Sequence, residues 1–235
     1  MLEKLLKFVH PEWIKIFNEP TSTDATLIDL LEIAVKEVIA TGVKSCPDSA
    51  DKILKAFNVD PNDVKCILMG QDPYMQPGIS TGHAFANLGE KWQPSLQIMV
   101  RELEKEYQLS DLAQRFDGSL QHWVNQGILL LNASLSCEQW KPNSHKEIWK
   151  PFMTELINKL NYLKVTRESM SSLVFVMLGK EAQSFTPIIQ KEWHYIIYRY
   201  HPAVETHGDL KFTGFYQEVN KYLAESGQEL INWVE

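Results

Sequence analysis

The stretch VKCILMGQDPY, residues 64–74, joins a short apolar run to a loop that opens with an acid and an aromatic ring. An apolar run with β-branched residues that ends at a Gly and a Pro turn is typical of a buried strand, here residues 64–69. In open parallel sheets, ligands bind beyond the carboxyl ends of the strands. Asp72, held by Pro73, is therefore a candidate catalytic carboxylate, although an Asp that only bonds its own turn has the same pattern.

Three further apolar runs end at polar residues or at Gly. They are residues 127–131, 173–178 and 195–198, which lead to Asn132, to Gly179 and Lys180, and to His201, respectively. Strands that alternate with amphipathic helices predict an α/β fold, with a central four-stranded parallel twisted sheet and helices on both faces. Right-handed connections bring the strand ends to one edge, so an acid, an amide, a cationic loop and an imidazole should border one pocket.

Apolar residues at helical spacing predict the helices that surround this sheet. Ser144 and Glu147 match the capping box S-x-x-E at the start of one of them. No repeat, low-complexity segment or linker interrupts the pattern, so residues 1–235 are expected to form a single domain. The expected helices cover residues 2–17 with an interruption at Pro11, 27–38, 50–57, 96–103, 144–160 and 213–226.

Composition limits the class of protein. Hydrophobic residues make up 44% of the 235 residues, enough for a sizeable core, and no apolar stretch is long enough to span a bilayer. The first residues lack a signal-peptide layout, and the scattered Cys46, Cys66 and Cys137 argue against a zinc or iron–sulfur site. An intracellular, reducing setting is expected, cytoplasmic or nuclear. The net charge of −7 argues against nucleic acid unless one face is locally basic or neutral.

The predicted pocket excludes several kinds of chemistry. The sequence has no Ser or Cys nucleophile elbow, no phosphate-binding G-x-x-x-x-G-K-[ST] loop and no H-E-x-x-H pattern. Acid–base or electrostatic work on a small polar group remains. The amide of Asn132 offers a donor and an acceptor side by side, as the edge of a base requires, and Tyr74 and Phe85 offer ring faces for stacking.

Residues 70–74 resemble the water-activating motif of the family 1 uracil-DNA glycosylases, and the resemblance continues through most of the chain. Several ordered motifs at fitting separations are far more specific than any one of them. The further matches are Pro77-Gly78, residues 82–85, 94–96 and 126–132, Ser144-His145 with Trp149, residues 178–180, His201-Pro202, and residues 231–233.

The resemblance implies a hydrolase that releases uracil from DNA and leaves an abasic site, and it implies no metal or cofactor. The deoxyuridine flips out of the helix, because the glycosidic bond cannot be reached inside the base stack. Asp72 would orient a water and stabilise the positive charge that grows on the sugar. His201, neutral, would donate a hydrogen bond to the departing uracil anion, a contribution of about 3–4 kcal/mol by analogy with oxyanion holes.

The same resemblance implies the substrate contacts. Backbone groups near Gln71 would hold the base, and Asn132 would bind the uracil edge and reject cytosine. Phe85 would stack on the ring, and Tyr74 would block the methyl group of thymine. The expected DNA-binding residues are Pro94, Ser95, Gly179, Lys180, Pro202, Ala203 and Glu205. The implied partner is uracil-containing DNA, single- or double-stranded, bound by a monomer, and a small anionic inhibitor protein of the kind that binds this family is a further candidate.

Each of these residues also fits a structural role. His201 fits a core histidine bonded to a carbonyl, and Asn132 fits a cap of the next segment. Ser95 fits the N-cap of its helix, and Lys180 fits a solvated surface charge. The two aromatic rings fit the core, a role compatible with lining a pocket.

The chain departs from the family pattern at several positions. Met75 and Gln76 stand where the motif usually has His and Gly, and Ala203 stands where a phosphate-binding Ser is usual. Glu205 falls where the family usually wedges a Leu into the base stack. A carboxylate that faces DNA repels phosphate and cannot act as an apolar wedge, although Val204 is a candidate replacement. A preference for single-stranded substrate is therefore expected.

Two other functions stay open at this point. One is a DNA-binding or replication accessory protein with little catalysis, suggested by the altered residues 203–206 and the acidic charge. The other is a relative that acts on another lesion, although Tyr74 and Asn132 narrow the pocket against large or methylated bases.

Overall fold

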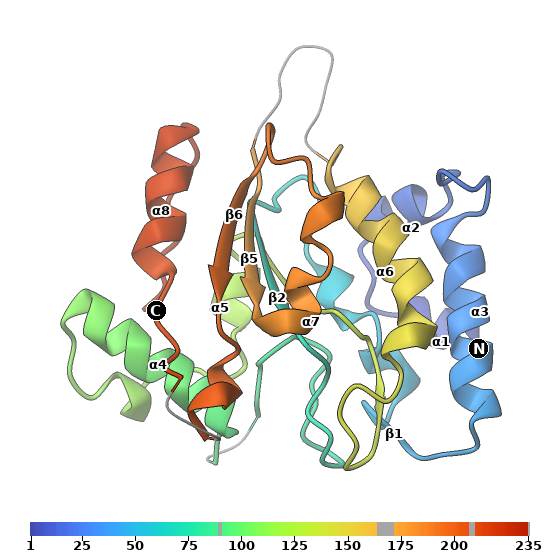
Figure 1. Ribbon diagram of the computed structural model, residues 1–235, viewed down its shortest axis with the longest axis horizontal. Coiled ribbons are helices and arrows are strands. Elements are labelled where there is room, and N and C mark those ends of the chain that lie inside the picture. Colours follow the sequence, from blue (N-terminus) through green and yellow to red (C-terminus); the bar gives the residue numbers. More distant parts are fainter. Residues whose placement is uncertain (89–90, 164–171, 207–209, 235) are drawn as a thin grey trace.

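A four-stranded parallel sheet forms the centre of the computed structural model, which describes residues 1–88, 91–163, 172–206 and 210–234 (Figure 1). The strand order is β3-β2-β5-β6, and all neighbouring pairs are parallel. The predicted α/β fold with its four-stranded parallel sheet is confirmed. The strands are β2 (Cys66–Gly70), β3 (Ile128–Asn132), β5 (Val174–Leu178) and β6 (Tyr195–Arg199).

The strands differ in how deeply their residues are buried. All five residues of β2, β3 and β5 are buried, as continuous apolar runs require when helices cover both faces. The edge strand β6 keeps only Ile197 fully buried. The register places Gly70 beside Asn132 and Leu178 beside Arg199, so the strands end close to one another and the loops that follow them meet at one edge.

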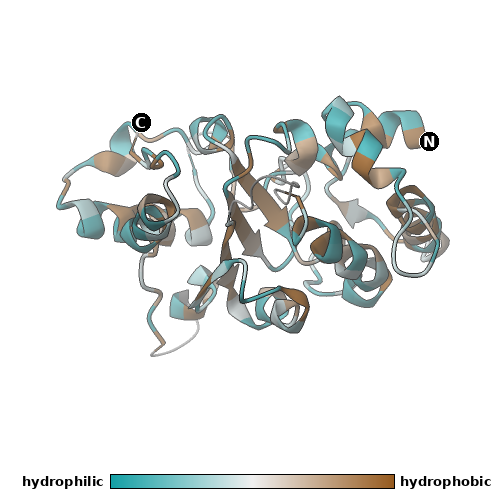
Figure 2. Cartoon of the chain, turned by 90° about the horizontal axis from the view of Figure 1, so that it is seen from above, coloured by the Kyte–Doolittle hydropathy of each residue, from teal (hydrophilic) through white to brown (hydrophobic). Residues whose placement is uncertain are grey.

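Helices cover the sheet on two sides. In Figure 1, α4 and α8 lie on one side of the strands, and α6 and α3 lie on the other. Figure 2 shows the hydrophobic strands between helices whose outer faces are hydrophilic. The helices are α1 (Leu2–Leu6), α2 (Pro11–Phe17), α3 (Leu27–Ala40), α4 (Pro94–Tyr107), α5 (Gln121–Val124), α6 (Lys146–Leu160), α7 (Gly179–Gln183) and α8 (Tyr216–Glu225).

Three local predictions differ from the structure. Residues 50–57, expected as one helix, form two short 3-10 segments, Ala50–Lys52 and Lys55–Asn58. The predicted capping box at Ser144 is absent, because α6 has His145 at its N-cap and the Ser144 hydroxyl instead bonds Glu138 N and Lys141 O. The last helix begins at Tyr216 rather than near residue 213.

A second, two-stranded sheet escaped the sequence pattern. Strand β1 (Ser45–Cys46) pairs antiparallel with β4 (Cys137–Glu138). Strands of two residues are too short to show a period-2 alternation. This small sheet fastens the segment after β3 against the N-terminal half of the chain.

None of the described helices combines the length and the apolar character that crossing a membrane requires. The described residues also contain no group of three or more His, Cys, Asp or Glu side chains placed to hold a metal ion.

Candidate active site

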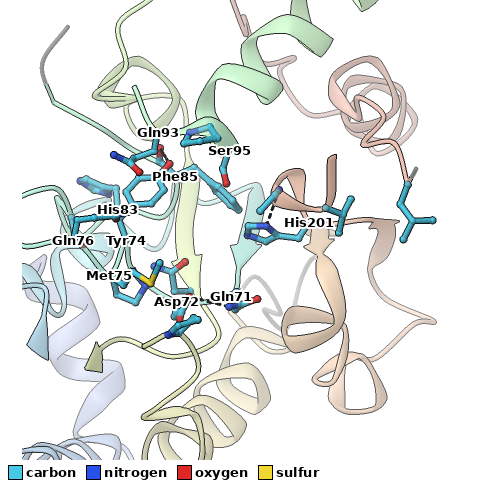
Figure 3. Close-up of a pocket in the computed structure, with 18 residues that line it drawn as sticks. Gln71, Asp72, Tyr74, Met75, Gln76, His83, Phe85, Gln93, Ser95 and His201 are labelled. Atoms are coloured by element: carbon cyan, nitrogen blue, oxygen red, sulfur yellow. Dashed lines mark hydrogen bonds between the residues drawn. The ribbon is translucent and has the colours of Figure 1, made fainter. Parts of the chain in front are cut away.

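A cavity of about 710 Å³ lies beyond the carboxyl ends of the strands, where the sequence predicted a pocket (Figure 3). Side chains reach it from the loop after β2, from α4 and from the segment after β6. The predicted catalytic and substrate-binding residues all line this cavity, namely Asp72, His201, Gln71, Tyr74, Phe85 and Asn132.

Gly70, at the end of β2, allows two of these side chains to lie close to the backbone. A Cβ atom at this position would lie 2.7 Å from Cζ of Phe85 and 2.9 Å from Oδ1 of Asn132. Real Cβ atoms do not tolerate such contacts, so a larger residue would displace the ring, the amide or both. The glycine of the motif thus sets the depth at which an aromatic face and an amide border the cavity.

Asp72 is half-buried and held by two donors. Its Oδ2 accepts a hydrogen bond from the backbone N–H of Asn143 at 2.6 Å, and its Oδ1 accepts one from Nε2 of Gln71 at 3.2 Å. Burial raises the pKa of the Asp72 carboxyl, and the two hydrogen bonds oppose that rise because they favour the ionised form. The carboxylate is therefore oriented by its neighbours without being neutralised by them.

The described residues of the cavity include no cationic side chain that would compensate that carboxylate. Among the described residues that line the cavity, Asp72 is the only Asp, Glu, Lys or Arg. A single negative charge in a partly desolvated site attracts a developing positive charge more strongly than it would in water. The site is thus suited to stabilise a cation that forms during a reaction.

His201 is held in one tautomer. The backbone N–H of Ala203 donates to Nδ1 of His201 at 3.2 Å, so Nδ1 acts as the acceptor and the ring proton of the neutral form resides on Nε2. Burial lowers the pKa of His201 to about 4. The imidazole is therefore neutral near pH 7 and offers Nε2–H as a donor.

Gly179 allows this position of the imidazole. A Cβ atom at Gly179 would lie 2.8 Å from Cβ of His201, and the residue has a φ of +85°, a conformation that Gly adopts without strain. Gly179 does not line the cavity itself, and its role in the structure is to let the segment after β6 approach the end of β5.

The aromatic wall of the cavity is built from Phe85, Tyr74 and His201. The Tyr74 hydroxyl donates to the backbone oxygen of Phe85 at 2.9 Å, which fixes both residues in the same wall. The Phe85 and His201 rings lie 5.6 Å apart between centroids and are tilted by 38°. A planar ring that enters the cavity would therefore have an aromatic face on one side and polar groups at its edge.

The expected DNA-binding residues divide into two groups. Pro94, Ser95 and Ala203 line the cavity, whereas Gly179, Lys180, Pro202 and Glu205 do not. Ser95 is the second residue of α4 and Gln93 is its N-cap, so the interpretation of Ser95 as an N-cap is wrong. Lys180 is exposed on α7, consistent with either of its two interpretations.

Glu205 requires a correction, because its carboxylate does not point into the cavity. Its Oε2 lies 2.6 Å from a guanidinium nitrogen of Arg101 on α4, and its Oε1 accepts from the backbone N–H of Phe212 at 2.7 Å. Its side chain is only 15% exposed. The Arg101 hydrogen bond holds the pKa of Glu205 below its usual range. Glu205 thus links residues 202–206 and Phe212 to Arg101 on α4, and the local pattern alone gave no sign of Arg101 as its partner.

Sequence reasoning missed three contributors to the site. Asn143 acts through its backbone N–H, a group that every residue type except Pro carries, although Pro142-Asn143 did offer a turn signal. Leu210 lines the cavity while 50% exposed, and no motif marks it. Ser136 anchors the loop from within, since its hydroxyl bonds Nδ1 of His145 and accepts from Nε1 of Trp149.

The fold and this site define an α/β protein with a carboxylate, a neutral imidazole and an amide at the carboxyl edge of a parallel sheet. The family model described as "Uracil DNA glycosylase superfamily" matches residues 57–224, and the chain belongs to this superfamily. The chain is 31% identical over 227 residues to the uracil-DNA glycosylase of Vibrio campbellii, with 95% of this chain and 96% of that protein covered. It is 32% identical over 234 residues to that of Exiguobacterium sibiricum, with 96% and 99% covered.

Solved structures share the fold. The crystal structure of mimivirus uracil-DNA glycosylase superposes with a TM-score of 0.77 at 21% identity, and the match covers 97% of this chain and 88% of that one. A variant of the mimivirus protein in complex with UGI also gives a TM-score of 0.77, at 22% identity, covering 97% and 90%. At these identities the likeness concerns the fold.

Proposed function

We propose that the chain is a monofunctional, monomeric family 1 uracil-DNA glycosylase, built as a single domain, that hydrolyses the N-glycosidic bond of flipped-out deoxyuridine. One observation carries the proposal: a half-buried carboxylate, with no compensating cation among the described residues of the cavity, lies in the same cavity as a neutral imidazole that offers its Nε2–H. Base excision is the chemistry that uses both, because the sugar becomes positive while the base leaves as an anion. The names of the curated relatives support the same activity.

The base would be recognised before the bond breaks. The extruded uracil stacks on Phe85 and presents its edge to Asn132, whose amide pairs with the donor and acceptor of uracil but not with the reversed pattern of cytosine. Tyr74, tied to the backbone of Phe85, leaves no room for the methyl group of thymine. Gln71 and the backbone beside it complete the contacts with the base.

The chemical step creates a positive charge on the sugar, near Asp72, and a negative charge on the base, near His201. The bond from the sugar carbon to the base breaks, and its electron pair leaves with the uracil anion. Nε2–H of His201 donates to a carbonyl oxygen of that anion, and Asp72 stabilises the sugar cation. A water oriented by Asp72 then bonds to the sugar carbon, and its proton passes to the carboxylate or to solvent.

Base release from a labelled single-stranded oligonucleotide with one uracil tests this function. Hot alkali then cleaves the abasic site, and a thymine oligonucleotide serves as the matched control. We expect cleavage with uracil only, and a slower reaction on the matching duplex at equal salt. Absence of release from folded protein would refute the proposed activity, and equal rates on both substrates would remove the single-strand preference.

A replication accessory role is the second candidate, and Ala203 and the net charge of −7 favour it. Fluorescence anisotropy with the same oligonucleotides separates the two, since an accessory protein would bind DNA without releasing the base. An inhibitor protein is a candidate partner as well, because a mimivirus relative was solved in complex with UGI.

Replacing Glu205 by Gln tests whether this residue supports the loop or repels DNA. The variant loses the ion pair with Arg101 but keeps an oxygen for the Phe212 N–H. Because the pair holds residues 202–206 against α4, we expect the KM for uracil-containing DNA to rise about 3- to 10-fold, the equivalent of roughly 0.6–1.4 kcal/mol. The kcat should fall less, since His201 precedes this segment and lies two positions after the end of β6.

Glu102→Gln is the matched control for that variant. Glu102 binds the same Arg101 at 3.0 Å, and Lys105 as well, but both of these partners lie with it on α4. Because its replacement leaves the pair between Arg101 and Glu205 in place, KM should stay within about 2-fold of the wild type. A lower KM for Glu205→Gln than for the wild type would instead mean that Glu205 repels DNA.

A further inference from the structure

Trp140 lies next in the chain to residues of the cavity wall and has no role in the steps described above. Its backbone N–H donates to the Met75 oxygen at 3.0 Å, and Met75 is part of the cavity wall. Two residues further on, Pro142 lines the cavity, and Asn143 then donates its N–H to Asp72. The turn that carries Trp140 is therefore fastened to the active site on both sides of Pro142.

The fold leaves the Trp140 indole in water. The residue is 64% exposed, and within the described part of the chain its ring contacts no other aromatic ring. Each of the other six tryptophans does make such a contact, namely Trp13, Trp92, Trp123, Trp149, Trp193 and Trp233. Packing therefore accounts for those six side chains but not for Trp140.

The backbone at Trp140 is also strained. Its φ is +68°, in the left-handed region that bulky residues rarely occupy. An observed strain of this kind, at a residue whose side chain gains no burial, is a reason to look for a function. The strained residue carries an exposed aromatic ring two positions before Pro142 of the cavity wall.

The surroundings favour a nucleic acid base as the partner of that ring. Lys141 follows directly, and its side chain, 68% exposed, pairs with the half-buried Glu138 at 3.3 Å. A pair with so exposed a partner is weak, so Lys141 can turn toward a phosphate. An exposed ring next to a lysine fits a stacked base with its phosphate, because every base has a π-face.

We propose that Trp140 is a stacking platform for the unpaired base next to the extruded nucleotide in single-stranded DNA. The proposal rests on the proposed function, because that function places an extruded nucleotide in the cavity. Extruding one base leaves its neighbour without a stacking partner on one side. The indole replaces that partner when no complementary strand holds the neighbour in place, so the contribution of Trp140 should be greatest on single strands.

A double-mutant cycle between the protein and the DNA tests the contact. Trp140→Ala and the wild type are compared on a single-stranded uracil substrate, and on substrates in which a tetrahydrofuran spacer replaces the base on the 5′ or the 3′ side of the uracil. We expect Trp140→Ala to lower kcat/KM about 5- to 150-fold on the complete substrate, as loss of about 1–3 kcal/mol of stacking implies. With the spacer on the contacted side, the loss should be about 2-fold or less.

Two variants complete the test. Trp140→Phe keeps a ring and should retain most of the wild-type rate, whereas Ile39→Ala removes an equally exposed side chain on α3 (60% exposed) and should change nothing. An equal loss of kcat/KM on all three substrates would mean that Trp140 has a structural role. No loss of kcat/KM on any substrate would mean that Trp140 does not contact the DNA and binds another partner, such as a protein. Either result overturns the proposal.

Fluorescence anisotropy of the same oligonucleotides separates this proposal from the activity. If the wild type releases no uracil, the proposed function fails. A dependence of affinity on both Trp140 and the neighbouring base would still support the platform in that case. If uracil is released but Trp140 and the neighbouring base contribute independently, only the platform fails.

Discussion

Asp72→Asn should lower kcat for uracil release by about 10³-fold, the scale of removing one well-placed electrostatic group. The amide has the shape of the carboxylate and keeps an oxygen for the N–H of Asn143, so the loop should hold its position. It carries no charge, and no other acidic side chain lines the described cavity to replace it. Single-turnover kinetics on the single-stranded substrate measure the loss, and binding of the same DNA should stay within about 3-fold.

Thermal unfolding provides the control for this variant. Burial raises the pKa of Asp72, so folding disfavours its ionised form. Stability from such a group is present below its unfolded pKa and is lost as the pH rises through its folded pKa. Asp72→Asn should therefore have a Tm equal to or above that of the wild type at pH 7, and the difference should shrink as the pH falls toward 4. Full activity in this variant would mean that Asp72 has another role.

The sequence predicted the sheet and the main elements of the site because these depend on local patterns. Residues 66–70, 128–132 and 174–178 are buried on both faces, and such strands appear as continuous apolar runs. Strand ends in a parallel sheet share an edge, so the sequence alone predicts that Asp72, Asn132 and His201 lie close together. The ordered motifs then gave these residues their proposed roles.

The remaining features depend on contacts between distant parts of the chain. Glu205 pairs with Arg101, which lies 104 positions earlier on α4, and nothing near either residue indicates the partner. The two donors that orient Asp72 include a backbone N–H 71 positions away, and a backbone group has no signature in residue type. The capping box at Ser144 failed for the same reason, because the small β1–β4 sheet engages this hydroxyl through Glu138.

His201→Ala should lower kcat by about 10²–10³-fold, because the uracil anion loses its donor during departure. The KM should change little, since the charge on the base develops only in the transition state and the donor contributes least to the bound substrate. His201→Gln retains an N–H donor and should recover part of the loss. An equal loss in both variants would mean that the imidazole acts through something other than donation.

The pH dependence shows whether the donor is the neutral ring. Burial lowers the pKa of His201 to about 4, so the ring stays neutral from pH 5 to 8 and the ratio of wild-type to His201→Ala rates should be constant there. A histidine with an ordinary pKa of about 6.5 would gain charge as the pH falls through that value, and the ratio would change near it. The N–H of Ala203 donates to Nδ1, so nitrogen NMR of the imidazole should show the proton on Nε2 across this range. A proton on Nδ1 alone would mean that the ring cannot donate from Nε2, and protons on both nitrogens or an inflection near pH 6.5 would mean that His201 works as a cation.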